Sequence, residues 1–173
     1  TLSIGTRAGV KDIQRNLAGF AVDMGRWRLA SDALVSAANL SVARPGLGIN
    51  VGNPHAIFFV DDCDKVDLER LGPIIETDPL FPEKINVNVA TIVDQQTIKL
   101  RVWERGVGLT LACGTGACAT AVAAIRSGRV QSPVSVSLPG GELRIDWKEG
   151  GPIEMEGPAT HVFTGTADWS QFG

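Results

Sequence analysis

Residues 101–128 read RVWERGVGLTLACGTGACATAVAAIRSG, and the rest of the chain is arranged around this stretch. Just before this stretch and at its start, Ile98, Leu100 and Val102 alternate with other residues, mostly polar, and this period of two predicts a strand. Two glycines then interrupt the strand. A run of small helix formers follows over 114–127, up to Gly128, a residue that commonly ends helices. Because this helix has almost no polar face, we expect the rest of the domain to surround it.

The start of the predicted helix combines a cysteine with two glycines. The first N–H groups of a helix lack intrahelical partners and favour negative charge, so a carboxylate can dock beside the sulfur of Cys113. Gly114 and Gly116 have no side chain to keep a ligand away. We expect the helix end and Arg105 to lower the pKa of this thiol, against burial and Glu104, and to make it the fastest cysteine to alkylate. The pattern alone also fits a core cysteine.

The other two cysteines are expected to have no chemical role. Cys118 lies inside the predicted helix and is interpreted as structural, whereas Cys63 follows a strand and is interpreted as a loop thiol. Three cysteines without CxxC spacing argue against a disulfide framework and against a zinc site, and we expect no cofactor.

The composition excludes several classes of protein. A hydrophobic content of 44% suffices for a core, and a formal net charge of -3 gives no basic surface for nucleic acid. The sequence has no secretory signal and no apolar run long enough to span a membrane. We therefore expect a cytoplasmic protein that binds neither nucleic acid nor a membrane.

Short strands are predicted through the remaining chain. Apolar runs bounded by Gly- and Pro-containing turns mark them at 2–9, 17–24, 56–60, 85–89, 134–138, 143–147, 153–155 and 161–166. Within the strand at 85–89, Asn86 and Asn88 lie on the face opposite the apolar residues, a pattern typical of outward-facing polar positions. Many short strands with one apolar helix predict an α+β domain, in which a curved, largely antiparallel sheet wraps around a central buried helix.

Several motifs together resemble the diaminopimelate epimerase family. They are Gly52-Asn53-Pro54-His55, the stretch 81–86, Glu104-Arg105-Gly106 and the stretch 112–118, with support from Asp23-Met24-Gly25 and Gly157-Pro158-Ala159. They occur in the family's order and span nearly all of the chain. The resemblance implies an enzyme of lysine and peptidoglycan precursor synthesis that interconverts LL- and meso-diaminopimelate without pyridoxal phosphate or metal. It also implies two similar lobes, each a sheet wrapped around a helix, with the substrate between them.

The resemblance assigns roles to particular residues. It implies that Cys113 is one of two proton-transferring thiols, which fits the need for one group on each face of an inverting carbon. His55 and Glu104 are the residues implied to tune the thiols. Six residues are implied to contact the substrate: Asn53, Asn86, Glu104, Arg105, Gly114 and Thr115.

One motif of the family is absent from the chain. The family's other thiol lies in a Gly-Asn-Gly…Arg-Cys motif, and neither Cys63 nor Cys118 has those neighbours. We therefore expect residues 1–14 to end a first lobe, 15–158 to form the second lobe, and 159–173 to be a strand returning to the first. The expected partners are diaminopimelate, the first lobe of the same enzyme and, in a homodimer, a second copy. The chain alone would hold half of an active site and be inactive.

Other functions remain open at this point. A proline racemase or hydroxyproline epimerase shares the fold and the two-thiol chemistry, although the Glu104-Arg105 and Asn53–His55 motifs argue against it. A phenazine-pathway isomerase of the same fold lacks paired thiols, so Cys113 argues against that. An isolated lobe would act as a non-catalytic module that binds a carboxylate at the helix end. A cysteine hydrolase is disfavoured because neither His55 nor His161 lies in a recognisable partner motif.

Overall fold

The computed structural model describes residues 1–6, 9–17, 19–30, 46–168 and 170. Within them the α-helices are α1 (Leu68–Glu76) and α2 (Gly114–Arg126), and a 3-10 helix covers Cys63–Lys65. The strands are β1 (Leu2–Thr6), β2 (Gly9–Arg15), β3 (Phe20–Gly25), β4 (Arg28–Leu29), β5 (Leu47–Asn50), β6 (Pro54–Phe59), β7 (Asn86–Asp94), β8 (Thr97–Glu104), β9 (Gly108–Thr110), β10 (Val134–Leu138), β11 (Gly141–Trp147) and β12 (Ile153–Gly157).

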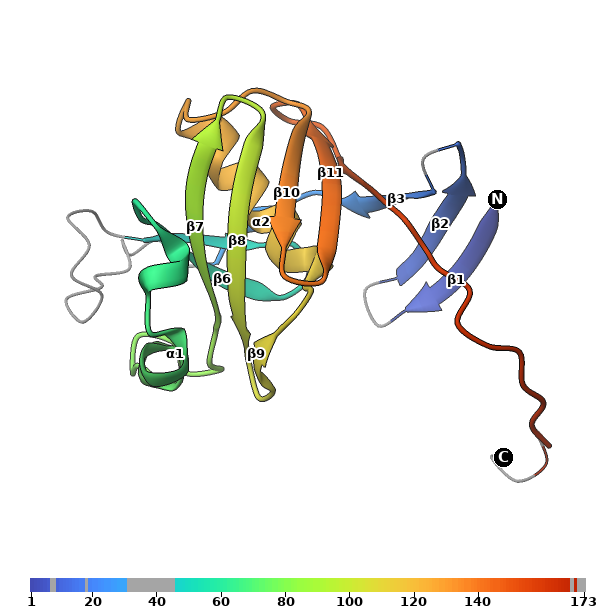
Figure 1. The fold of residues 1–173 in the computed structure, drawn as a ribbon, viewed down its shortest axis with the longest axis horizontal. Helices are drawn as coiled ribbons and strands as arrows, with labels where there is room; N and C mark the ends of the chain where they lie inside the picture. Colours follow the sequence, from blue (N-terminus) through green and yellow to red (C-terminus); the bar gives the residue numbers. More distant parts are fainter. Residues whose placement is uncertain (7–8, 18, 31–45, 169, 171–173) are drawn as a thin grey trace.

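One curved sheet contains all of these strands (Figure 1). Its order is β1-β2-β3-β12-β11-β10-β8-β7-β6-β5-β4, with β9 paired to β8. Neighbours are antiparallel except at two places, where β6 runs parallel to β7 and β10 runs parallel to β8. The predicted α+β class and largely antiparallel sheet are confirmed.

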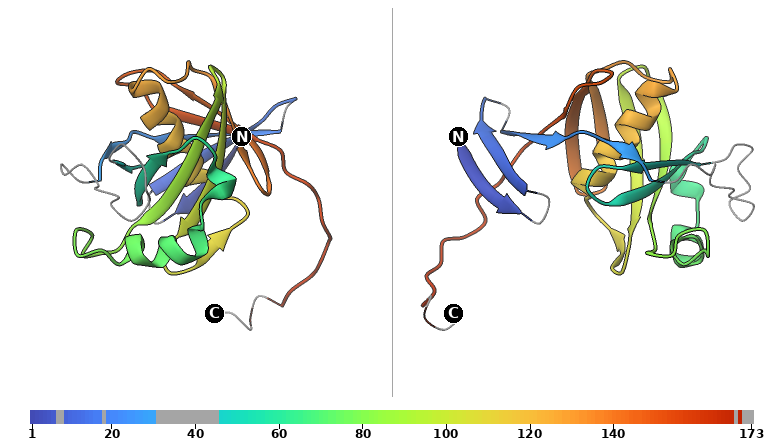
Figure 2. Two further views of the ribbon diagram at one scale, coloured as in Figure 1. Left: turned by 60° about the vertical axis from the view of Figure 1, so that its left-hand side comes forward. Right: turned by 180° about the vertical axis from the view of Figure 1, so that it is seen from behind.

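The helix α2 lies in the hollow of this sheet and contacts β5, β6, β7, β8, β10, β11 and β12 (Figure 2). All its residues from Gly116 to Ala124 are buried. Six are alanine or glycine, whose small size lets strands approach from several sides. Ser127 is the C-cap and Gly128 follows with φ of +68°. The helix predicted over 114–127 is therefore confirmed to within one residue.

A second apolar cluster lies on the other face of the central strands. The buried face of α1, formed by Leu68, Leu71 and Ile75, packs there with Val87 and Val89 of β7. Strand β7 is thus covered on both faces, since its Ala90 belongs to the cluster around α2. Because both faces of β7 are covered, its Asn86 and Asn88 are buried.

The ends of the chain lie away from this core. In Figure 1 and in the right-hand view of Figure 2 the β1–β2 hairpin stands apart from the body, and Leu2, Ile4 and Val10 on it are exposed. The strand expected over 161–166 is wrong: residues 159–168 are exposed and lack regular structure. An isolated strand leaves its backbone N–H and C=O groups unpaired, and no described strand pairs with this segment.

A close approach between α1 and β8 gives a test of the packing. A Cβ on Gly72 would lie 2.4 Å from Cγ and Cδ2 of Trp103. We expect Gly72→Ala to lower the free energy of unfolding by about 1–3 kcal/mol, although alanine is the better helix former. Urea unfolding measures this, with the exposed Glu69→Ala of the same helix as control. A Gly72→Ala protein as stable as the wild type would contradict the packing described here.

Candidate active site

Cys113 is the N-cap of α2. Its backbone is extended, with φ of −145° and ψ of 102°, and its Sγ accepts a hydrogen bond from the N–H of Gly116 at 3.3 Å. A Cβ on Gly116 would lie only 3.1 Å from that sulfur, and one on Gly114 would lie 3.1 Å from Sδ of Met155. Glycine at these positions therefore brings the sulfur against the first turn of the helix.

His55 approaches Cys113 from β6. The ring is fully buried, and its Nε2 lies 3.1 Å from Oγ1 of Thr115 and 3.2 Å from Oδ1 of Asn53. Oγ1 of Thr115 lies in turn 3.6 Å from Sγ of Cys113. Burial lowers the pKa of His55 to about 4, opposed by its bond to Asn88 and helped by the charge of Arg105. The imidazole is therefore neutral at pH 7.

Glu104 approaches Cys113 from the end of β8. Its Oε1 accepts a hydrogen bond from the hydroxyl of Thr110 at 2.7 Å. Burial raises the pKa of the Cys113 thiol, the bonds from Thr115 and Gly116 lower it, and the charge and hydrogen bond of Glu104 raise it further. The expectation of a lowered pKa is therefore wrong, because the sulfur is enclosed and faces a carboxylate. Arg105, expected to lower it, is not among the influences on this thiol.

Asn86 and Arg105 hold the neighbouring loop. Asn86 accepts from the backbone N–H of Arg105 at 2.9 Å and donates to the carbonyl of Pro54 at 2.7 Å. The guanidinium of Arg105 donates to the carbonyl of Glu83 at 2.9 Å. The amide of Asn86 thus joins two loops that carry other candidate residues, and the side chain is buried rather than outward-facing.

One residue of the site was not singled out from the sequence. Asn88 is fully buried and links His55 to the helix, through the carbonyl of Gly116 and the hydroxyl of Thr120. The alternation of β7 does place it opposite Val87 and Val89, but that face is covered by α2 instead of by water. The available signal was an amide that recurs among the apolar residues of the strand predicted at 85–89.

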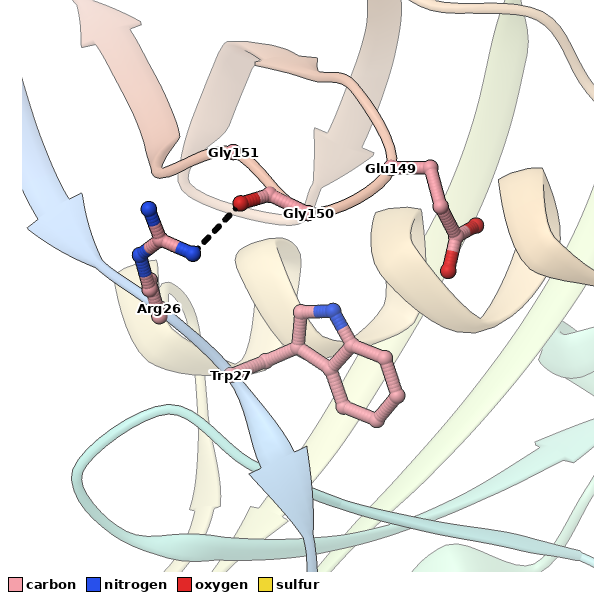
Figure 3. A pocket seen from close by; sticks show the side chains of 5 residues that line it. All are labelled: Arg26, Trp27, Glu149, Gly150 and Gly151. Carbon is pink, nitrogen blue, oxygen red and sulfur yellow. Dashed lines mark hydrogen bonds between the residues drawn. The ribbon is translucent and has the colours of Figure 1, made fainter.

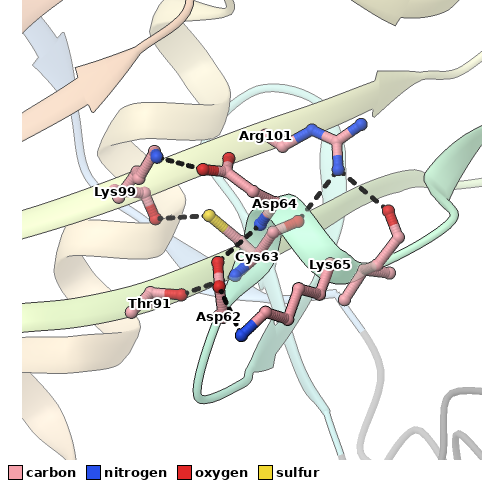
Figure 4. Close-up of polar contacts among 8 residues, drawn as sticks. Asp62, Cys63, Asp64, Lys65, Thr91, Lys99 and Arg101 are labelled. Atoms are coloured by element: carbon pink, nitrogen blue, oxygen red, sulfur yellow. Dashed lines mark hydrogen bonds and ion pairs between the residues drawn. The ribbon is translucent and has the colours of Figure 1, made fainter.

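The other two cysteines lie outside the site. Cys63 is fully buried, so its interpretation as a loop thiol is wrong: it belongs to the 3-10 helix, where Thr91 and Arg101 bind its backbone (Figure 4). Asp64 also forms an ion pair with Lys99 there. Cys118 is fully buried in α2 and burial raises its pKa to about 12, as a cysteine that packs in the core would show.

Hollows elsewhere on the described surface contain none of the candidate residues. One of them is lined by Arg26, Trp27 and residues 149–151, and Arg26 spans it by donating to the carbonyl of Gly150 at 2.6 Å (Figure 3). No group of three or more His, Cys, Asp or Glu in the described part is placed to hold a metal ion. No helix in that part has the length and apolarity to cross a membrane.

The fold places the chain in a class of proteins with known structures. A hydroxyproline epimerase from Agrobacterium vitis aligns with a TM-score of 0.58 at 14% identity, over 89% of this chain and 55% of its own. A protein assigned to phenazine biosynthesis PhzC/PhzF, from Clostridium difficile strain 630, aligns with a TM-score of 0.64 at 13% identity, over 96% of this chain and 64% of its own. At these identities the likeness shows the fold alone.

Sequence comparison identifies the family within that class. The family model for diaminopimelate epimerase matches residues 48–162, so the chain belongs to the diaminopimelate epimerase family. The diaminopimelate epimerase of Rhizorhabdus wittichii is 69% identical over 127 residues, which cover 73% of this chain and 46% of that protein. That of Erythrobacter litoralis is 49% identical over 179 residues, covering 98% and 66%. The chain spans about half the length of the Rhizorhabdus wittichii protein and of a further curated relative.

The buried histidine predicts a pH dependence of stability. The folded pKa of about 4 lies below the ordinary 6.5, so its contribution is complete above pH 6.5 and is lost as the pH falls towards 4. Between pH 6.5 and 5 we expect the free energy of unfolding to fall by about 2 kcal/mol. Urea unfolding at each pH measures this. His55→Gln should flatten the profile, whereas His161→Gln at an exposed position should not; an unchanged slope in His55→Gln would reject the assignment.

The Cys113 thiol predicts a second pH profile. Because Glu104 raises the pKa of this thiol, Glu104→Gln should lower it and speed iodoacetamide labelling at pH 8 by roughly fivefold. Mass spectrometry resolves the site, and the fully buried Cys63 and Cys118 should stay unlabelled until unfolding. Glu154→Gln, an exposed position on β12, is the control. Labelling of Cys113 that is slower or unchanged in Glu104→Gln would count against the contact.

Proposed function

We propose that this chain supplies one proton-transferring thiol, Cys113, to a cofactor-independent epimerase that interconverts LL- and meso-diaminopimelate in lysine and peptidoglycan precursor synthesis. The supporting observation is the placement of this sulfur at the N-terminus of α2, close to Glu104 and to Thr115, which in turn contacts His55. Membership of the diaminopimelate epimerase family supports the substrate.

The helix end would bind the substrate carboxylate. The N–H groups of Gly114 and Thr115 lie in the first helical turn, where no intrahelical partner exists, and the helix dipole favours an anion there. Donors at the carboxylate stabilise the negative charge that develops when the α-proton leaves. Asn53 and Arg105 would offer further polar contacts to the substrate.

Cys113 would act as the acid of the pair. Inversion needs one group that removes the α-proton and a second, on the opposite face, that returns a proton. A thiol with a raised pKa holds its proton at neutral pH, so Cys113 donates to the carbanion when LL-diaminopimelate or its isomer binds in the matching orientation, and accepts in the reverse reaction. The second thiol would come from outside these 173 residues, because Cys63 and Cys118 are buried apart from the site.

Two surfaces would meet the lobe that carries the second thiol. The β1–β2 hairpin exposes Leu2, Ile4 and Val10, and the segment after β12 exposes Val162 and Phe163. Exposed apolar side chains gathered on separate segments are typical of surfaces that another structure covers. We place the enzyme in the cytoplasm, where the three free thiols would stay reduced.

Turnover of the 173-residue chain and of the full-length enzyme that contains it tests the proposal. We expect the chain alone to form no meso product above background, and the full-length enzyme to form it. In that enzyme, Cys113→Ser should lower kcat by roughly 10²–10⁴-fold, because a positioned acid is lost, and Cys118→Ser should retain most activity. A coupled assay for meso-diaminopimelate gives the rates, and α-deuterium uptake in D₂O reports the proton transfer.

Four results would each overturn a different part of the proposal. Turnover by the isolated chain would show that the second group lies within it. Full activity of Cys113→Ser would remove the thiol from the mechanism. Faster turnover of proline or hydroxyproline than of diaminopimelate would favour the alternative that shares this fold, and carboxylate binding without turnover by the full-length protein would favour a binding module.

A further inference from the structure

The orientation of the buried amide of Asn88 is fixed by its neighbours. Its Nδ2 lies 3.0 Å from the carbonyl oxygen of Gly116 and 2.9 Å from Oγ1 of Thr120, and its Oδ1 lies 3.0 Å from Nδ1 of His55. A backbone carbonyl only accepts hydrogen bonds. Rotating the amide by 180° would set two acceptor oxygens against each other without water. Asn88 therefore presents its oxygen to His55.

The tautomer of His55 follows from this orientation. The amide oxygen only accepts, so Nδ1 of His55 carries the proton; the neutral ring has one proton, and Nε2 is therefore an acceptor. The hydroxyl of Thr115, 3.1 Å away, then donates to Nε2.

Asn53 does not reverse this assignment. Its Oδ1 is drawn 3.2 Å from Nε2, which would pair two acceptors. Asn53 is only half-buried, and this is the single side-chain hydrogen bond it makes among the described residues, so its amide turns to present an N–H at little cost. Asn88 would lose its buried hydrogen bond to the Gly116 carbonyl by turning, because two oxygens would then face each other, and an unpaired buried polar group costs more than a solvated one.

We propose that Asn88 is a positioning residue: by fixing the Nδ1–H tautomer of His55, it draws the hydroxyl proton of Thr115 away from Cys113 and keeps that cysteine in its thiol form. Because the Thr115 hydroxyl donates to Nε2, its Oγ1 can only accept from the S–H group, 3.6 Å away. It therefore no longer lowers the pKa of Cys113 as a hydroxyl that donates to the sulfur would. The thiolate would retain only the N–H of Gly116 as a close donor. The proposal rests on the proposed function only for the use of that thiol in proton transfer.

Other charged and titratable groups lie near the sulfur or near the His55 ring, and they stay constant in the test. Glu104 approaches from β8, Arg105 follows it and acts on His55, and Cys118 lies one turn further along α2. Glu104 also favours the thiol, so Asn88 acts beside it and not through it. A change at Asn88 leaves all three groups in place.

Asn88→Leu tests the proposal in the 173-residue chain. Leucine cannot accept from Nδ1, so we expect the His55 proton to move to Nε2, donate to Thr115, and free that hydroxyl to donate to the thiolate. Nitrogen-15 NMR of the histidine rings should show Nδ1 protonated in the wild type and Nε2 protonated in Asn88→Leu; His161→Gln identifies the other ring. Iodoacetamide labelling of Cys113 at pH 8 should become roughly tenfold faster.

Two further variants keep the proposal falsifiable. Thr120→Val removes one contact of Asn88 but leaves Gly116 to orient it, so the tautomer and the labelling rate should match the wild type. Asn88→Asp retains an acceptor towards Nδ1 and should keep the Nδ1–H tautomer. If Asn88→Leu does not fold, an Asn88→Asp protein with His55 protonated only on Nε2 would overturn the proposal. A wild-type His55 protonated on Nε2, or an Asn88→Leu protein with unchanged tautomer and labelling, would overturn the proposal. None of these measurements uses turnover, so an inactive enzyme with the expected tautomer would contradict only the proposed function.

Discussion

The N-terminus of α2 has to satisfy its backbone donors inside a protein that is apolar around the rest of the helix. The sulfur of Cys113 takes the N–H of Gly116, and the carbonyl of Cys113 takes that of Ala117. The polar side chains of the site come from the start of β6, at His55, and from the end of β8, at Glu104. The alanines of α2 let the sheet close around the helix, and the sheet in turn brings polar residues to its one polar end.

Burial favours the uncharged form of both His55 and Cys113. It lowers the pKa of His55 and raises that of Cys113, so both are uncharged at neutral pH. Glu104 ends β8 and Arg105 lies in the turn after it, and both residues are partly exposed. Charged groups therefore lie at the partly exposed rim and uncharged ones within, an arrangement that avoids the cost of burying isolated ions.

The sequence predicted the structure well where the periodicity of apolar residues indicated both the type of element and its burial. The apolar run of α2 predicted a helix enclosed by strands, and its bounds agree to within one residue. Asn88 was missed because alternation identifies a face but not what covers it, and α2 covers this one. The direction of the Cys113 pKa was wrong because a helix dipole is worth at most about 2 kcal/mol in such sites, and enclosure outweighs it. The strand expected at 161–166 is wrong because a strand needs a hydrogen-bonded neighbour, and the local pattern of residues does not show whether one is present.

The parallel pairing of β6 with β7 joins His55 to Asn86 and Ile57 to Asn88. Because strand side chains alternate with a period of two, a slip of β7 by one residue would turn both amides into the apolar cluster beside α1 and bring Val87 and Val89 against the histidine and the helix. Such a misaligned sheet would leave amides without partners and valines beside polar atoms. The same few side chains thus specify both the contacts of the site and the register of the sheet. The buried amides of the site also disfavour a misaligned sheet.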